Sequence, residues 1–210
     1  MSHRLHETMD VKEQILKGAS ELYMRYGLKS ITMDEVARHL SISKKTIYQY
    51  YTDKDELVFS FLQMVLNSQK CDIVEITESS EDVIEELMRT ADFMKKKVAT
   101  ASQALLFDMK KYHPKAWKLY QDFKNDFLIE HLKRSFERGI AQGYFRKDID
   151  VDILSTMRIE QIELAFNHDV YSPERFETSS VHMQIFDHFI YGISSMKGHK
   201  RLNEIRHFTD

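Results

Sequence analysis

The 210-residue sequence contains few of the residues that make tight turns or covalent cross-links: two prolines, six glycines and one cysteine. A chain built from many tight turns needs more proline and glycine, so the composition predicts a mostly helical protein. The single cysteine, Cys71, excludes an internal disulfide framework and a zinc site made from several cysteines. This cysteine count fits a reducing compartment.

Long hydrophobic runs are also missing. The most apolar stretch, residues 57–66, is ten residues long and is interrupted by Ser60 and Gln63, whereas a membrane-spanning helix needs about 20 apolar residues. The first ten residues are polar and lack the apolar stretch of a secretory signal. We therefore expect a cytoplasmic protein without a membrane partner.

Charge is close to balanced over the whole chain but not along it. The net charge of -3 argues against a protein that coats nucleic acid without specificity. Residues 37–52, however, contain Arg38, Lys44 and Lys45 and no acidic residue. This segment predicts a local field that attracts phosphate, although chance clustering of charges would produce the same pattern.

Apolar residues recur at helical spacing along most of the sequence, and no strand pairing is evident. The pattern predicts an all-α fold of about nine helices, over residues 11–26, 32–40, 43–51, 53–65, 80–94, 101–112, 115–140, 150–166 and 180–196. Two of the helix starts have strong signals. Thr32 and Glu35 form a T-x-x-E capping box, and Ser43 can cap the helix that follows.

Residues 32–51 contain two short helices joined by three residues, with Ala37 where a steep helix crossing requires a small side chain. This layout is typical of a helix-turn-helix, whose second helix enters the major groove of DNA. An ordinary helical hairpin with a solvated lysine face would share the local pattern. The positions expected to face the core are Val36, Leu40, Ile42, Ile47 and Tyr50.

If those residues face inward, Lys44, Lys45, Tyr48 and Gln49 must face outward. Two cations, a phenol and an amide that can make paired hydrogen bonds to adenine are side chains typical of DNA recognition. The second helix is therefore the predicted recognition helix.

Residues 31–37 and 43–57, together with the preceding helix that ends at Tyr26-Gly27, closely resemble the TetR family of one-component bacterial transcriptional regulators. The resemblance covers about the first third of the chain. It implies an Ω-like homodimer of nine-helix chains, in which a three-helix DNA-binding head is joined to a larger ligand-binding and dimerisation body. We place the head at residues 8–66, its helix-turn-helix at about 32–51, and the body at 67–210.

The resemblance also implies the DNA contacts. Thr32 and Lys54 stand at helix starts where the family contacts phosphate. Ser41 replaces the glycine common at the turn, so its backbone must be tolerated without the freedom of glycine, and Gln49 replaces a frequent histidine, which should change operator preference. The recognition segment comprises Ser43, Lys44, Lys45, Thr46, Tyr48, Gln49 and Tyr50.

The C-terminal part is rich in methionine and aromatic residues, which form either a plain core or the lining of an apolar cavity. If they line a cavity, four carboxylates, those of Glu86, Asp108, Glu160 and Glu163, could contact a polar or cationic ligand, although a solvated face is the simpler interpretation. The candidate ligand-binding residues are Phe93, Phe107, Met109, Tyr112, Trp117, Tyr120, Phe123, Met157 and Phe166.

The helix expected at 180–196 is apolar over about half of its circumference, more than one core contact requires. This width predicts a C2 dimer in which the helix pairs with the one at 150–166 to form a four-helix interface. The residues assigned to this interface are Ile153, Met157, Leu164, Val181, Ile185, Phe189, Gly192 and Ile193.

Enzymatic motifs are missing. None of the ten histidines are paired at i, i+4, and Glu204-x-x-His207 occurs once where a di-iron bundle needs two copies. We therefore expect no catalytic residues, no metal and no cofactor. The predicted function is a homodimeric repressor of a palindromic operator, relieved by a small hydrophobic or aromatic effector. A ligand-independent DNA-binding regulator and a helical-bundle enzyme are the two alternatives.

Overall fold

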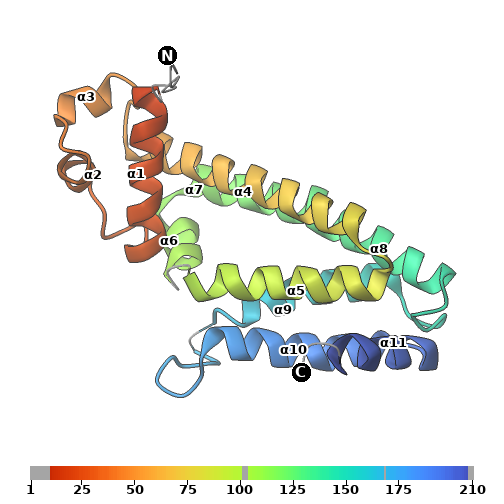
Figure 1. Cartoon of the computed structure of the whole chain (residues 1–210). Helices are drawn as coiled ribbons and strands as arrows, with labels where there is room; N and C mark the ends of the chain where they lie inside the picture. Colours follow the sequence, from red (N-terminus) through yellow and green to blue (C-terminus); the bar gives the residue numbers. More distant parts are fainter. Residues whose placement is uncertain (1–9, 101–103, 168, 208–210) are drawn as a thin grey trace, which may run out of the picture. The chain divides into compact units, whose positions relative to one another are not determined.

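The structure is a computed structural model that describes residues 10–100, 104–167 and 169–207. These residues form helices and no β-strand, apart from an isolated bridge between Phe145 and Ser194 (Figure 1). The all-α fold class is therefore confirmed. The chain divides into two compact units, one from the described parts of Met1–Leu66 and Ala101–Tyr120, the other from those of Asn67–Thr100 and Gln121–Asp210.

The first unit holds the N-terminal helices around a small apolar core. Ile15, Val36 and Ile47 are fully buried, and the ring of Tyr23 meets that of Phe61 edge-on, with centroids 5.4 Å apart. The helices that lie in or begin in this unit are α1 (Val11–Tyr26), α2 (Met33–His39), α3 (Lys44–Tyr48), α4 (Lys54–Ser79), α6 (Leu105–Tyr112) and α7 (Pro114–Asp122).

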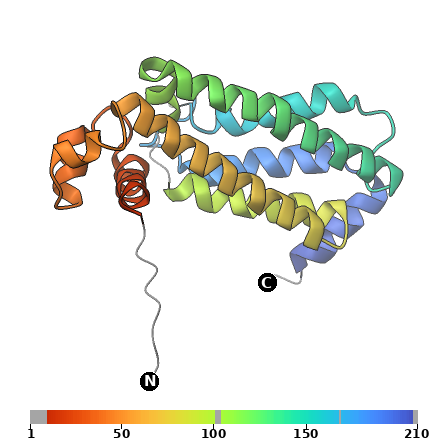
Figure 2. The same cartoon turned by 90° about the horizontal axis from the view of Figure 1, so that it is seen from above.

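The second unit has a larger core, in which Phe136 is surrounded by the rings of Phe145 and Phe189. Helix α10 packs against α5 and α9, and α8 packs against α5 and α9. The π-helical segment η1 joins α7 to α8 without a break, and Figure 2 shows the three as one green rod. The remaining elements are α5 (Val83–Thr100), η1 (Phe123–Ile129), α8 (Glu130–Ala141), α9 (Val151–Leu164), α10 (Thr178–Ile193) and α11 (Met196–His207).

Several predicted helix boundaries were wrong, among them three with a clear structural reason. Helix α4 continues to Ser79, well beyond residue 65. Asp82, not Ser80, caps α5, because its carboxylate accepts the backbone N–H groups of Ile84 and Glu85. The last expected helix stops at Ile193, and a new helix follows in which Gly198 donates its N–H to the Ser195 hydroxyl.

The described residues therefore contain ten helical rods when α7, η1 and α8 are counted as one, against the nine expected. The additional rod is α11. Residues 104–120 also group with the N-terminal unit, whereas the sequence-based division at 66/67 assigned them to the C-terminal domain. The predicted domain limits, 8–66 and 67–210, stay a prediction. Residues 8, 9 and 208–210 of these domains lie outside the described residues. The first three residues of the helix expected at 101–112 also lie outside them.

One histidine is enclosed in the second unit. His182 on α10 is fully buried, and burial lowers its pKa to about 4, with the nearby charge of Arg158 acting in the same direction. His182 is therefore neutral near pH 7.

Acid is expected to destabilise the protein through His182 between about pH 6.5 and pH 4. An unfolded histidine has a pKa of about 6.5, so as the pH falls the unfolded state takes up the proton first and stability declines. In His182→Phe we expect this decline to be smaller by roughly 3 kcal/mol at pH 4, measured by urea unfolding across the range. His188→Phe, which alters an exposed histidine of the same helix, should keep the wild-type decline, and an unchanged decline in His182→Phe would contradict the assignment.

Candidate nucleic-acid interface

Helix α2 begins at a complete capping box. The Thr32 hydroxyl oxygen accepts the N–H of Glu35 at 3.3 Å, and the Thr32 N–H donates to the Glu35 carboxylate at 2.6 Å. These hydrogen bonds from Thr32 hold the pKa of Glu35 below its usual value. The box fixes the first residue of α2 as Met33 and leaves Thr32 exposed at the helix start, as the sequence predicted.

The turn between α2 and α3 is fixed by backbone geometry. Ser41 has a positive φ of 55°, alone in this respect among the non-glycine residues that the structure describes. The N–H of Ser41 reaches the carbonyl of Arg38 at 3.2 Å, and that of Ile42 reaches the carbonyl of Ala37 at 3.0 Å. The serine thus adopts the left-handed conformation that favours glycine.

Helix α3 starts at Ser43, whose hydroxyl accepts the N–H of Thr46 at 3.0 Å. Ile47, the residue after Thr46, is fully buried in the core, and Tyr51 is buried as well. Because α3 is anchored on that side, its opposite side faces solvent. The exposed side chains are Ser43, Lys44, Lys45, Tyr48 and Gln49, while Thr46 and Tyr50 are half-buried.

Lys44 is not a free cation on this surface. Its Nζ donates to the carboxylate of Asp34 on α2 at 2.8 Å, and this bond raises the pKa of Lys44. Both side chains are exposed, so the pair is a surface ion pair of small energetic value. Among the described residues, no ion pair joins Lys45 to an acidic side chain. Of the two lysines, Lys45 is the more available for phosphate.

Lys54 lies differently from the sequence-based expectation. Its Nζ donates to the backbone carbonyl of Leu28 at 2.5 Å and approaches that of Lys29 at 3.5 Å. The side chain is half-buried, and burial lowers its pKa. Lys54 therefore ties the start of α4 to the loop after α1, and its ammonium group is not placed in the exposed row of α3.

Two contacts join α6 and the residue after it to the N-terminal helices of the same unit. The buried carboxylate of Asp108 accepts the backbone N–H of Lys29 at 2.8 Å. The imidazole of His113 meets the carboxylate of Asp55 at 2.6 Å, between Nδ1 and Oδ1. Sequence analysis missed both links, because residues so far apart carry no local signal of their contact.

The nine candidate ligand-binding residues belong to two compact units. The first unit holds Phe107, Met109, Tyr112, Trp117 and Tyr120, and the second holds Phe93, Phe123, Met157 and Phe166. In the first unit, Trp117 and Tyr120 have ring centroids 5.5 Å apart. Met109 is buried, whereas Phe107 is 60% exposed. The assignment of these nine residues to a ligand cavity stays a prediction, and Phe107 has the exposure of a surface side chain.

The four candidate carboxylates all have protein partners. Glu160 and Glu163 both bind Lys124, at 2.9 and 3.0 Å, and Asp108 accepts the Lys29 N–H. Glu86 is buried between α4 and α8 side chains. Its partners are Ser135, which donates at 2.6 Å, Thr77 at 3.3 Å, Arg138 and, at 3.7 Å, His131.

The residues assigned to a dimer interface separate into two groups. On α9, Ile153, Met157 and Leu164 are exposed, as an interface requires. On α10, Val181, Phe189 and Ile193 are buried inside the chain itself, so these three side chains are corrected to core. The reason is the orientation of α10 about its own axis, because its most apolar side packs against α5 and α9. Gly192 is exposed and Ile185 half-buried.

Within residues 10–100, 104–167 and 169–207, no group of three or more His, Cys, Asp or Glu side chains could hold a metal ion. None of the helices described is long and apolar enough to cross a membrane.

The N-terminal region matches a known family model. Residues 15–61 fit the model of bacterial regulatory proteins of the tetR family. The HTH-type transcriptional regulator YhgD of Bacillus subtilis is 32% identical over 150 residues, which cover 70% of this chain and 72% of YhgD. The HTH-type transcriptional repressor KstR2 of Mycobacterium tuberculosis is 23% identical over 151 residues, 67% of this chain and 72% of KstR2.

A solved structure shares the fold of most of the chain. It is a putative transcriptional regulator from Saccharomonospora viridis in complex with choline, with a TM-score of 0.73 and 19% identity. The superposition covers 88% of this chain and 97% of the other. The likeness therefore extends well beyond residues 15–61.

Proposed function

Because the chain belongs to the TetR family of bacterial regulatory proteins, we propose that it is a homodimeric repressor whose binding to a palindromic operator is relieved by a small effector. DNA-binding transcriptional regulation is the function of the family, which is not one of enzymes. The repressor assignment draws support from KstR2, which is named a repressor. Such a regulator acts in the cytoplasm, where the bacterial chromosome lies.

The observation that carries the DNA-binding assignment is the exposed side of α3. Lys45, Tyr48 and Gln49 project from a helix that Ile47 anchors in the core and Ser43 caps. In the major groove a lysine contacts phosphate or guanine, and a glutamine makes paired hydrogen bonds to adenine. Gln49 is therefore the residue we propose to read a base, with Lys45 as the main phosphate contact.

Alanine substitutions on α3 are expected to separate these two roles. Lys45→Ala should weaken binding to all sequences and reduce the slope of log K against log salt by about 1. Gln49→Ala should instead cost roughly 1–3 kcal/mol of discrimination at the base that it reads. Fluorescence anisotropy on an operator selected from genomic fragments, at several salt concentrations, measures both effects.

The ion pair of Lys44 supplies an internal control. Lys44→Ala should change the salt slope less than Lys45→Ala, because Asp34 already neutralises that lysine at 2.8 Å. Asp34→Asn should strengthen binding, because it frees Lys44 for phosphate. If every one of these variants binds the selected operator with wild-type affinity and salt slope, α3 is not the recognition helix.

The exposed apolar side of α9 supports the homodimer. Ile153 is 63% exposed, and Met157 and Leu164 follow it on the same side of the helix. Apolar side chains lined up in this way mark an interaction surface. We propose that two copies of α9, with the exposed part of α10 around Gly192, form the C2 interface.

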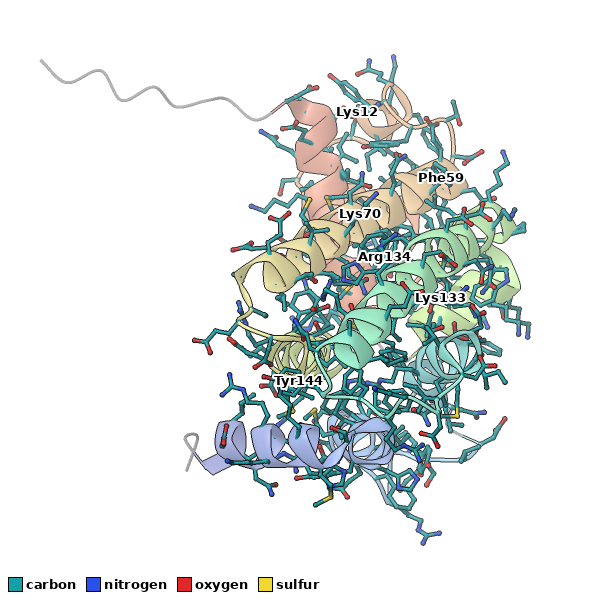
Figure 3. The ribbon with its side chains drawn as sticks, turned by 90° about the vertical axis from the view of Figure 1, so that its right-hand side faces the viewer. Lys12, Phe59, Lys70, Lys133, Arg134 and Tyr144 are labelled. Atoms are coloured by element: carbon teal, nitrogen blue, oxygen red, sulfur yellow. The ribbon has the colours of Figure 1, made fainter. Side chains whose placement is uncertain are left out.

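Charge on this surface is expected to separate the dimer. The double variant Ile153→Asp/Met157→Asp should run as a monomer in light scattering at micromolar concentration, because the paired interface would bury unpaired carboxylates. Arg134→Asp, a change on the exposed surface of α8 (Figure 3), should leave the dimer intact. A wild-type protein that is monomeric at this concentration would remove the dimer from the proposal.

Relief by an effector requires that the body favour two states with different operator affinity. The contacts of Asp108 with Lys29 and of His113 with Asp55 tie α6 to the loop and helix that flank the DNA-binding helices. We propose that an effector shifts α6 and that these two contacts pass the shift to α2 and α3. The choline complex of the structural relative supports small-molecule binding in this fold. A regulator without an effector is the second candidate.

A further inference from the structure

Buried polar atoms without partners concentrate on two helices. Among the described residues, six buried side-chain nitrogen and oxygen atoms have no hydrogen-bond partner, and four of the six belong to α9 and α10. These four are Nη1 of Arg158, Oε1 of Gln161 and both ring nitrogens of His182. Native proteins satisfy most buried polar groups, so this concentration needs an explanation.

Arg158 is the most unusual member. The residue is 6% exposed, and Nη1 of its guanidinium has no hydrogen-bond partner among the residues that the structure describes. It lies over the rings of Phe186 and Phe189, at 5.1 and 5.8 Å from their centroids. Burial lowers the pKa of Arg158 to about 10, and no acidic side chain counteracts this.

The acidic residues on the neighbouring turns are committed elsewhere. Glu160 and Glu163 on α9 both bind Lys124, at 2.9 and 3.0 Å. Asp187 on α10 binds Arg206. None of these three carboxylates pairs with Arg158.

His182 places a second polar group beside this cation. His182 lies one turn before Phe186 on α10, and the guanidinium of Arg158 lies over the ring of Phe186. The charge of Arg158 also lowers the pKa of His182. The backbone of Ala91 on α5 raises the pKa of His182 and is the smallest of the three influences on it. Neither ring nitrogen, however, has a partner at hydrogen-bond geometry. A neutral imidazole and a charged guanidinium thus share one buried region between α5, α9 and α10.

A buried cation without a counter-charge destabilises the folded chain, and contacts with aromatic rings offset only part of that cost. A leucine or methionine would fill the space without the penalty. The arginine is therefore better explained by an anion that it binds than by packing.

We propose that Arg158 is the anion-binding residue of an effector site between α5, α9 and α10, and that the effector is a monocarboxylate with an apolar body. The planar guanidinium pairs with a carboxylate through two parallel hydrogen bonds. One guanidinium beside a neutral imidazole supplies one positive charge, which a single carboxylate matches and a doubly charged phosphate does not. The rings of Phe186 and Phe189, over which the guanidinium lies, make the surroundings of the bound carboxylate apolar. This inference deepens the proposed effector control and rests on it.

The test uses the full-length protein with straight-chain acids from hexanoate to dodecanoate, below their micelle concentrations, and 3-phenylpropanoate. Each acid is compared with the primary alcohol of the same carbon skeleton. We expect at least one acid to raise the melting temperature of the wild type while its alcohol does not. In Arg158→Met the affinity for that acid, measured by calorimetry, should fall roughly 30-fold or more.

Unliganded Arg158→Met should melt at or above the wild-type temperature, because the variant removes an uncompensated buried charge and keeps the apolar volume. Arg158→Lys, which keeps the charge but loses the paired hydrogen bonds, should retain part of the affinity. Arg134→Met, which alters an exposed arginine of α8 (Figure 3), should bind the acid like the wild type.

Four results would overturn the inference: no acid binds the wild type, acids bind Arg158→Met as tightly as the wild type, unliganded Arg158→Met melts well below the wild type, or Arg158→Met is a monomer where the wild type is a dimer. The last result would mean that a second copy supplies the carboxylate. Operator binding is measured separately. An acid that binds through Arg158 without weakening operator binding would leave Arg158 as an anion-binding residue but would remove the effector role of that anion and the relief proposed above.

Discussion

Ile47→Asp is expected to abolish operator binding by unfolding the N-terminal helices. Ile47 is 0% exposed, at the point where α3 packs against the core of its unit. An aspartate there buries a charge that has no partner, a change in the class that costs more than roughly 4 kcal/mol. Total stabilities of about 5–15 kcal/mol leave little margin for that loss. Circular dichroism and operator binding by anisotropy measure the outcome.

Lys45→Asp is the matched control, because it introduces the same side chain two residues earlier at an exposed position. It should keep the wild-type helix content and lose operator affinity through charge repulsion alone. Ile47→Val, which keeps an apolar side chain, should cost only about 0.5–1.5 kcal/mol and retain binding. Operator affinity that survives in Ile47→Asp would show that Ile47 does not anchor the recognition helix.

The N-terminal helices were predictable because their signals are local. A capping box joins residues three apart, so Thr32 and Glu35 can be recognised without knowledge of the fold. The same holds for Ser43, whose partner is Thr46. Given these starts, the inward position of Ile47 fixes which side chains of α3 are exposed. The strain at Ser41 was also foreseen, since the family resemblance placed a glycine there.

The partners of the lysines were not predictable, because they come from other helices. Asp34 reaches Lys44 across ten residues, and the carbonyl of Leu28 reaches Lys54 across 26. Charge patterning in the sequence shows that Lys44 lacks acidic neighbours along the chain, whereas Asp53 and Asp55 flank Lys54. It does not show which acid the folded chain brings to them. Two of the three expected phosphate lysines consequently have protein partners.

In the body, the sequence identified helices but not their rotation. A helix that is apolar on two sides has no unique inward face, so the sequence could not decide whether Phe189 on α10 meets its own core or a second copy. Packing decides it, since α5 and α9 lie against α10 and bury Phe189. The same uncertainty hid Arg158, because an arginine within an amphipathic helix is ordinarily exposed.

Core and candidate ligand residues in the body are likewise distinguishable only in the folded chain. Aromatic residues at helical spacing have the same appearance in sequence whether they fill a core or line a cavity. Phe136 was not among the candidate ligand residues and lies at the centre of the core, whereas Phe107 was a candidate and is 60% exposed. Alanine substitutions at these two positions therefore measure how much a core phenylalanine contributes to the stability of the protein.

Phe136→Ala is expected to cost about 3–5 kcal/mol of stability. The side chain is 0% exposed, with ring centroids 5.8 Å from both Phe145 and Phe189, so its removal leaves a cavity lined by aromatic rings. At about 2–4 °C per kcal/mol for a chain of this size, the melting temperature should fall by roughly 6–20 °C. Phe107→Ala, which removes the same ring from an exposed position, should change stability by less than about 0.5 kcal/mol. Equal losses in the two variants, measured by urea unfolding and by thermal melts, would contradict the placement of the core around Phe136 and with it the packing that orients α10.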